Sequence, residues 1–210
     1  MSNPTVPLPG TFRRLSDGER KLRHRRDGLL RSGADPSLWF ETCGPRAREL
    51  GWPVYPELKT GTKRKPATIQ GQSIRPVKEH FMDRALPPED LVAWWATWAF
   101  EQNTAVLSGD AADLVVLDCD IFDPVAAARI VEIADEVFGA TPFMRVCNAP
   151  KFALVYRRPK GKLNLKQRIL ELEQRHGNEK QQIEIKDGSA LTIAGSHMTT
   201  GNPFKWVRGA

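Results

Sequence analysis

Short apolar runs alternate with polar segments along most of the chain, and glycine or proline often separates them. Apolar residues spaced three or four positions apart predict helices, whereas short runs of branched apolar residues predict strands. The pattern predicts helices over 36–50, from 89 onward, over 124–138 and over 165–176. It predicts strands over 52–56, 104–107, 114–120, 152–157, 183–185 and 190–194. Strands that interleave with helices in this way predict an α+β fold around a mixed or antiparallel sheet.

Several element boundaries are marked by specific residues. Asp-Pro at 35–36 and again at 123–124 combines a capping side chain with a proline at the first helical position. Glycine is typical of the position just after a helix, and we expect helices to end at Gly51, Gly139 and Gly177. The Asp-Gly pair at 187–188 is typical of a tight hairpin turn, so it predicts that the two strands on either side pair with each other.

The strand predicted over 114–120 ends in two carboxylates, in the order Leu-Val-Val-Leu-Asp-Cys-Asp. Because side chains alternate along a strand, Asp118 and Asp120 share one face. Glu184 lies between Ile183 and Ile185, so it faces away from the core that they enter, an unusual place for an unpaired carboxylate. Oxygen ligands of this kind suit Mg²⁺ or Mn²⁺. The three carboxylates predict a cation site; the alternative for the aspartate pair is a strand end beside a helix cap.

Basic and hydroxyl residues are candidates to complete such a site. Arg145 and Lys151 precede the strand predicted over 152–157, and Arg157 ends it. Lys151 and Arg157 share a face if no bulge lies between them. After the last predicted strand, the segment 195–201 is rich in donors and contains His197, which is a candidate phosphate ligand or an ordinary structural histidine.

The composition of the chain indicates its class of binding partner and its cellular compartment. The 210 residues carry a net charge of +6, and the pI of about 9.4 favours a polyanionic partner such as nucleic acid. Much of the basic character lies in residues 1–34, which we interpret as a basic arm ahead of one domain over 35–210; the arm either contacts phosphates or is simply solvated. Three scattered cysteines, no membrane-length apolar run and no signal peptide predict a cytoplasmic protein.

A series of short motifs then runs through the chain in a fixed order. They are Gly-Trp-Pro-Val-Tyr-Pro at 51–56, Gly-Thr-Lys-Arg-Lys-Pro-Ala at 61–67, Trp-Trp at 94–95, Asn-Thr-Ala-Val-Leu-Ser-Gly at 103–109, the acidic strand 114–120, Arg-Val-Cys-Asn-Ala-Pro-Lys at 145–151, Ile-Glu-Ile at 183–185 and Gly-Ser-His at 195–197, continuing to 206. In this order they resemble the bifunctional DNA primase/polymerase (prim-pol) domains of the archaeo-eukaryotic primase superfamily. Each motif is unspecific by itself, but their joint order over about 46–206 is specific.

The resemblance implies an RRM-like catalytic unit joined to a smaller α/β unit, with the active site in the cleft between them. It implies a DNA-dependent nucleotidyltransferase that synthesises or extends primers on single-stranded DNA from NTPs or dNTPs. Two Mg²⁺ or Mn²⁺ ions would be held by the three carboxylates. By the same resemblance, nucleotide contacts would come from Arg145, Lys151, Arg157, Ser196 and His197. Lys63 and Lys65 would contact the DNA template or the nucleotide.

One departure and one absence qualify the expected activity. Many relatives carry Ser-x-His in the second motif, whereas this chain has Asn-Ala-Pro-Lys at 148–151, so Lys151 would replace the histidine as a phosphate ligand. Relatives are often fused to a helicase, and this sequence has no P-loop motif, so the resemblance implies a replicative helicase as a partner in cis or in trans, in a bacterial, phage or plasmid context. Two alternatives stay open: a non-catalytic module that binds single-stranded or origin DNA, and, less favoured, a metal-dependent nuclease using Glu184 and Lys186.

Overall fold

The computed structural model describes residues 16–59, 68–69, 72–73, 85–110, 112–158, 168–177 and 179–208. The chain divides into two compact units, Met1–Asp35 and Pro36–Ala210. The described part of the first unit is built on helix α1 (Asp17–Arg31). A capping box begins this helix: Ser16 Oγ accepts from the Glu19 N–H at 3.2 Å, and Glu19 Oε2 accepts from the Ser16 N–H at 2.7 Å. None of the residues of α1 is buried.

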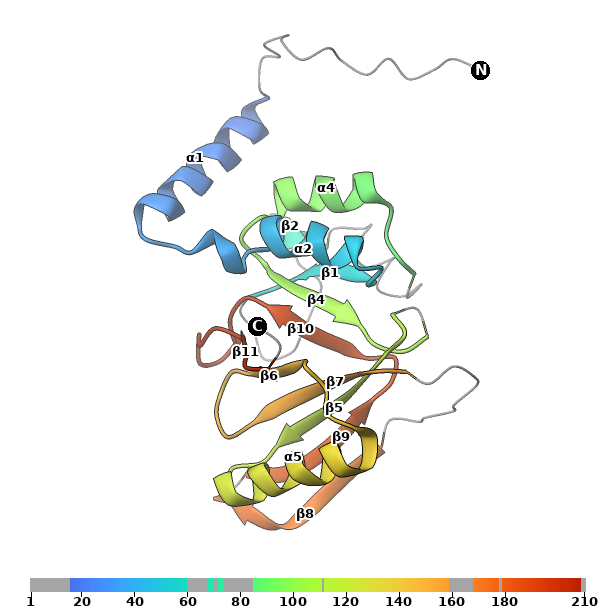
Figure 1. Ribbon diagram of the computed structural model, residues 1–210. Coiled ribbons are helices and arrows are strands. Elements are labelled where there is room, and N and C mark those ends of the chain that lie inside the picture. Colours follow the sequence, from blue (N-terminus) through green and yellow to red (C-terminus); the bar gives the residue numbers. More distant parts are fainter. Residues whose placement is uncertain are drawn as a thin grey trace, which may run out of the picture. The chain divides into compact units, whose positions relative to one another are not determined.

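The second unit begins with a three-stranded antiparallel sheet in the order β1-β4-β10 (Figure 1). Its strands are β1 (Val54–Glu57), β4 (Asn103–Leu107) and β10 (Ala190–Ala194). A short 3₁₀ turn η1 (Pro36–Leu38) precedes helix α2 (Phe40–Glu49), and α2 packs with α4 (Glu89–Trp98) against this sheet. Phe40 and Trp95 are fully buried between these elements, with their ring centroids 6.4 Å apart. The apolar side chains of the helices and the sheet therefore form one core.

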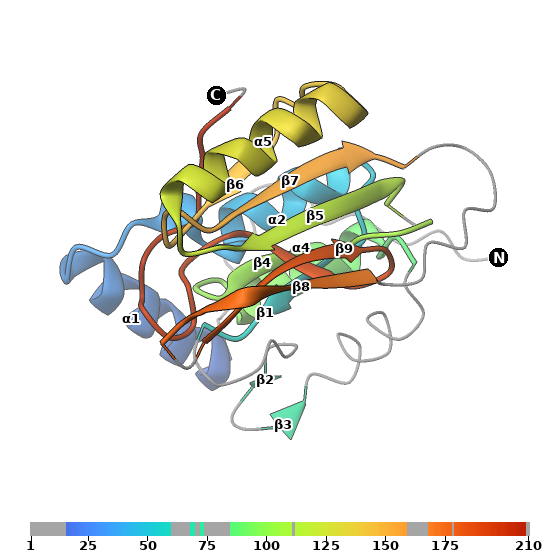
Figure 2. The same ribbon diagram turned by 90° about the horizontal axis from the view of Figure 1, so that it is seen from below.

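A six-stranded antiparallel sheet makes up most of the rest of this unit, in the order β11-β6-β7-β5-β9-β8. Its strands are β5 (Leu114–Asp120), β6 (Met144–Val146), β7 (Phe152–Arg157), β8 (Arg168–His176), β9 (Glu179–Lys186) and β11 (Lys205–Trp206). Helix α5 (Pro124–Phe138) lies along one face of this sheet, as Figure 2 shows. Two short strands, β2 (Thr68–Ile69) and β3 (Gln72–Ser73), pair with each other. Helices packed on antiparallel sheets confirm the predicted α+β class.

Two of the predicted helices differ from the observed structure. The segment predicted as a helix over 165–176 contains strand β8, which pairs with β9. Leu170 and Leu172 alternate with Glu171 and Glu173, and this two-residue period is the strand signal that decides the outcome. The helix predicted over 36–50 is also divided, because Trp39 stands between the 3₁₀ turn and α2 as the N-cap residue.

The turn at 187–188 does not form the predicted hairpin. β9 pairs with β5 and β8, whereas β10 pairs with β4 in the other sheet, so this turn carries the chain from one sheet to the other. Arg158 fixes it through a bidentate contact, with Nε 3.0 Å from Asp187 Oδ1 and Nη2 3.1 Å from Oδ2. Gly109 passes so close that a Cβ atom there would lie 2.9 Å from the backbone nitrogen of Gly188.

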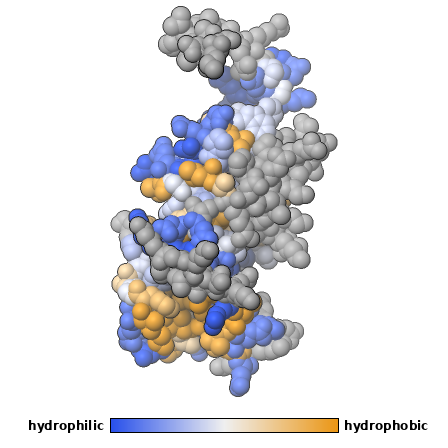
Figure 3. Space-filling view, turned by 90° about the vertical axis from the view of Figure 1, so that its right-hand side faces the viewer, coloured by the Kyte–Doolittle hydropathy of each residue, from blue (hydrophilic) through white to orange (hydrophobic). Residues whose placement is uncertain are grey.

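The surface of this unit is uneven in hydropathy. Figure 3 shows apolar side chains gathered at its lower end, where Figure 1 places α5, β8 and β9. Exposed apolar residues of these elements include Val137, Phe138 and Leu170. None of the helices within the described ranges combines the length and the apolarity that spanning a bilayer requires.

Candidate active site

Pairing of β5 with β9 brings two of the three predicted carboxylates together. Asp118 lies directly opposite Glu184 in the register, and Asp120 lies opposite Gln182. Directly opposed residues on antiparallel strands point to the same face, so Asp118, Asp120 and Glu184 all face one way. The side chains of Asp118 and Glu184 are only 13% and 11% exposed. Two ionised carboxylates side by side at this depth repel each other, and a nearby cation relieves the repulsion.

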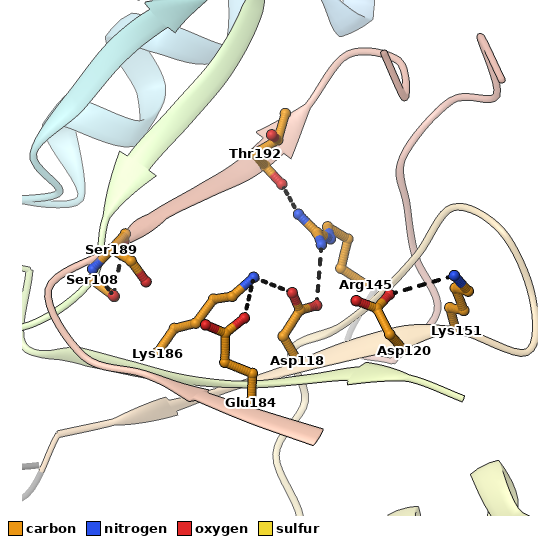
Figure 4. Close-up of polar contacts among 9 residues, drawn as sticks. All are labelled: Ser108, Asp118, Asp120, Arg145, Lys151, Glu184, Lys186, Ser189 and Thr192. Atoms are coloured by element: carbon orange, nitrogen blue, oxygen red, sulfur yellow. Dashed lines mark hydrogen bonds and ion pairs between the residues drawn. The ribbon is translucent and has the colours of Figure 1, made fainter. Parts of the chain in front are cut away.

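Cationic side chains surround this pair (Figure 4). The Lys186 ammonium is in ion-pair contact with Asp118 Oδ2 and lies 3.3 Å from Glu184 Oε2. Nη2 of Arg145 lies 3.9 Å from the other oxygen of Asp118. From its sequence context, Lys186 is a candidate only for the nuclease alternative. The signal that could have found it is its spacing of two residues from Glu184, which places both side chains on one face of β9.

These groups line a cavity of about 930 Å³, here named the main cavity. The lining residues are Asp118, Asp120, Arg145, Cys147, Asn148, Lys151, Phe152, Gln182, Glu184, Lys186, Ser189, Ala190, His197 and Phe204. Six of the predicted site residues are therefore gathered around one space. Ser196 is the chain neighbour of one of them, His197.

Arg157 is placed elsewhere. It lines a separate, mainly apolar cavity of about 380 Å³, together with residues such as Leu117, Phe138 and Ile185. The structure therefore does not bring Arg157 together with the other predicted nucleotide ligands. Lys63 and Lys65, predicted to contact DNA or nucleotide, lie outside the described residues.

Arg145 is a buried cation that connects the two sheets. Its Nη1 donates to the backbone carbonyl of Thr192 on β10, and its guanidinium lies 4.6 Å from the ring centroid of Phe204. Thr192 Oγ1 in turn donates to Glu57, which is fully buried on β1. A chain of polar contacts therefore links the three-stranded sheet to Asp118, and it fixes the position of the guanidinium. The sequence gave no indication of Thr192 or Glu57.

Lys151 stands on the opposite side of the carboxylates. Its Nζ is 3.8 Å from Asp120 Oδ1 and 3.8 Å from the ring centroid of Phe122. Its side chain is 26% exposed, twice the exposed fraction of Lys186, and Asp120 is 44% exposed. Lys151 is thus a cation held in place by a ring and a carboxylate, yet accessible to a ligand in the main cavity.

His197 belongs to a loop that closes on itself through backbone contacts. Its Nδ1 accepts from the N–H groups of Thr199 and Thr200, each at 3.3 Å. A neutral imidazole that accepts at Nδ1 carries its proton on Nε2, so Nε2 is the donor nitrogen of this ring. Asn103 holds the start of the loop: its Nδ2 donates to the Ser196 carbonyl at 2.7 Å, and its Oδ1 accepts from the Ser196 N–H at 2.9 Å.

Cys119 separates the two aspartates in sequence but faces the other side of the sheet. It is fully buried in the core beneath α5. Burial, followed by the charges of Asp118 and Asp120, raises the pKa of this thiol from 9.0 to about 12. Cys119 is therefore a small core residue that takes no part in the chemistry of the main cavity.

The comparison with known families bears directly on this cavity. The sequence model of bifunctional DNA primase/polymerase N-terminal domains (Prim-Pol) matches residues 45–210, a range that contains every residue lining the main cavity. The chain belongs to the Prim-Pol family. The resemblance inferred from the motifs is confirmed, and membership implies a primase/polymerase-type nucleotidyltransferase role for this Prim-Pol domain. No curated protein and no solved structure matches the chain.

The donor set of the Prim-Pol domain fits a divalent cation in chemistry. Asp118 and Glu184 offer hard oxygen ligands, and the Lys186 ammonium between them occupies the position of a cation. In the arrangement seen across the described ranges, no three His, Cys, Asp or Glu side chains converge closely enough to form a metal-binding group. For all three carboxylates to bind one cation, the Asp120 side chain would have to rotate away from Lys151. The ammonium of Lys186 would have to leave its place between Asp118 and Glu184.

Proposed function

We propose that this Prim-Pol domain is a DNA-dependent nucleotidyltransferase that synthesises or extends primers on single-stranded DNA during replication. One observation carries the proposal. Asp118 and Glu184 are paired across neighbouring strands, beside Asp120, in a cavity of about 930 Å³ whose other charged side chains are cations. A cavity of this size accommodates a nucleotide, and the combination of carboxylates with cations suits a ligand that carries phosphates and divalent cations together.

The cationic side chains have distinct parts in the proposed reaction. Lys151 is accessible and held by Phe122, so it is the leading ligand for the phosphates of an incoming NTP or dNTP. His197 would donate from Nε2 to the same phosphates, and the backbone of Ser196 would help to position it. Arg145 is too deeply buried to reach far, so it acts by orienting Asp118 and neutralising part of its charge.

Asp118, Asp120 and Glu184 would hold Mg²⁺ or Mn²⁺, with two ions expected from the family. When bound, such ions would activate the attacking 3′-hydroxyl and stabilise the charge on the triphosphate. The carboxylates themselves orient these ligands, because β5 and β9 fix their spacing through backbone hydrogen bonds.

We also propose that this domain has the two-part arrangement of the archaeo-eukaryotic primase fold. The six-stranded sheet with α5 would be the RRM-like catalytic unit, and β1, β4 and β10 with α2 and α4 would be the smaller unit. Residues from both sheets line the main cavity, which supports placing the active site where the units meet. We further propose single-stranded DNA as template and a replicative helicase, in cis or in trans, as partner.

The test is synthesis on unprimed single-stranded DNA with labelled nucleotides and Mg²⁺ or Mn²⁺. The wild type is compared with Asp118→Asn, which keeps the volume of the side chain and removes its charge. We expect short products from the wild type and a loss of at least about 10²-fold in the variant, because the cation that would stabilise the charge on the phosphates is no longer held by this carboxylate. Arg129→Gln, on the exposed face of α5, serves as the matched control and should retain full activity.

Each other outcome supports a different function. Extension only on a primed template would mean a polymerase that needs a partner to initiate. Shortening of labelled DNA without nucleotides, lost in the Asp118 variant, would mean a nuclease. DNA binding without synthesis or cleavage, unchanged by Asp118→Asn, would overturn catalysis and favour a binding module.

A further inference from the structure

Lys186 occupies the place between the two most buried carboxylates of the main cavity (Figure 4). It follows Glu184 by two residues on β9, so both side chains face Asp118 on β5. Its ammonium is 3.3 Å from Glu184 Oε2 and in contact with Asp118 Oδ2. All three side chains are nearly buried. The oxygens that a divalent cation would use are therefore already engaged by a cation of the chain itself.

The local charges balance without any added ion. Asp118 and Glu184 supply two negative charges, and Lys186 and Arg145 supply two positive charges within ion-pair distance of them. A divalent cation placed on the same oxygens would lie within a few ångströms of the lysine ammonium. At this depth the repulsion is about four times as strong as it is in water. The ion and the ammonium thus exclude each other.

We propose that Lys186 is a displaceable counterion, which holds Asp118 and Glu184 while nucleotide is absent and moves to the phosphates when a nucleoside triphosphate enters with its divalent cation. The inference rests on the metal site of the proposed function. Lysine suits this role because a compact charge on a flexible four-carbon stem can change partners by rotation. Lys186 lines the same cavity as Lys151 and His197, so phosphates bound there would be within the space it faces.

If Lys186 is displaced in this way, the binding of the divalent cation is coupled to the binding of the nucleotide. Without nucleotide, cation binding must displace Lys186 from two carboxylates with no new counterion for it. With nucleotide, the phosphates accept the ammonium, so the same displacement costs less. Cation and nucleotide therefore each raise the affinity for the other, and by linkage the two factors are equal.

The experiment measures Mn²⁺ binding to the full chain at constant ionic strength, without nucleotide or DNA, from the electron paramagnetic resonance signal of free Mn²⁺. We expect Lys186→Gln to bind Mn²⁺ roughly 5- to 150-fold more tightly than the wild type, the range of typical couplings between sites. Lys186→Arg, which keeps the charge, should bind no more tightly than the wild type. Lys180→Gln is the matched control: it lies on the same strand, its Nζ contacts Glu171 at 2.9 Å, and it is half-exposed outside the cavity.

The outcomes separate this inference from the function on which it rests. If Lys186→Gln and the wild type bind Mn²⁺ equally, and Asp118→Asn binds it less, the metal site stands and the role of Lys186 is overturned. If neither binds Mn²⁺, or if Asp118→Asn/Lys186→Gln binds it as tightly as Lys186→Gln does, the proposed metal site itself fails. Should Lys186→Gln be unstable, Mn²⁺ must raise its Tm by more than it raises that of the wild type; a smaller rise overturns the inference.

Discussion

The two aspartates and the cysteine between them face opposite sides of the sheet, because successive side chains of a strand alternate between its two faces. Asp118 and Asp120 face the main cavity, while Cys119 enters the core under α5 and is fully buried. The thiolate is the reactive form of cysteine, and its formation is suppressed where burial raises the pKa to about 12. A chemically reactive residue type thus becomes inert one position away from the candidate chemistry.

This contrast predicts an order of cysteine modification. Iodoacetamide at pH 8 should alkylate Cys43 and Cys147, which are partly exposed, and should leave Cys119 unmodified until the protein unfolds. The measurement is a time course of peptide mass spectrometry on the native protein, with a sample in denaturant as control. Modification of Cys119 in the native state as fast as that of Cys147 would contradict both its burial and its raised pKa.

At the same scale, the three carboxylates could be found from the sequence because their signal is local. Asp118 and Asp120 follow the two-residue period of a strand, and Glu184 lies between two isoleucines. Arg157 shows where this reasoning stops. It lies across from Leu114, at the end of β5 distant from the aspartates, and reaches the apolar cavity instead. The distance along a strand to its pairing partner depends on register, which local pattern does not contain.

At the scale of elements, most helices and strands follow from the hydrophobic pattern, whereas the sheet in which a strand pairs does not. The turn at 187–188 has the composition of a hairpin turn, but β10 leaves β9 to pair with β4. The contacts that fix this choice are distant in sequence: Arg158 binds Asp187, and Gly109 allows the backbone of Gly188 to approach. The two-residue spacing places Lys186, next to this turn, on the same face of β9 as Glu184, but its contact with Asp118 follows only from the pairing of β9 with β5.

Asn103 on β4 attaches the loop that carries His197 to the three-stranded sheet. Its buried amide forms two hydrogen bonds with the backbone of Ser196, and Gly195, at φ 112°, leaves the space for it. A Cβ atom on Gly195 would lie 2.0 Å from Asn103 Oδ1. The Asn103 side chain therefore replaces the backbone hydrogen bonds of a strand pair, and it attaches the loop to β4 beyond the end of β10.

Replacing Asn103 by alanine leaves two backbone groups of Ser196 without these partners, so we expect a loss of about 2–4 kcal/mol in the free energy of unfolding. Urea denaturation measures this loss. Nucleotide affinity should fall in the same variant, because Ser196 and His197 are no longer held. The control is Asn202→Ala, an exposed amide of the same loop, for which we expect a stability change below about 0.5 kcal/mol. Equal effects from the two variants would contradict the anchoring role.

At the scale of the whole molecule, net positive charge is concentrated in residues 1–34. Residues 1–34 contain eight Arg and Lys against three Asp and Glu, which gives +5 of the total +6 and leaves +1 for residues 35–210. Within this segment α1 forms a capped helix with no buried residue, so its basic side chains are presented to solvent. The Prim-Pol match begins only at residue 45. Residues 35–210 are thus nearly neutral overall, although cations line part of the main cavity.

This distribution predicts that the arm supplies much of the salt-dependent affinity for single-stranded DNA. The variant Lys21→Gln/Arg23→Gln/Arg25→Gln removes three exposed charges from α1. If each contacts a phosphate, the slope of log K against log salt becomes shallower by roughly 0.7 per contact, about 2 in all. Fluorescence anisotropy of a labelled oligonucleotide at several salt concentrations measures this slope. The matched control removes three exposed charges from the second unit, with Arg46→Gln/Arg129→Gln/Lys180→Gln. A slope that changes equally in both variants would mean that net charge alone acts, and an unchanged slope in the α1 variant would mean that the arm does not touch the phosphates.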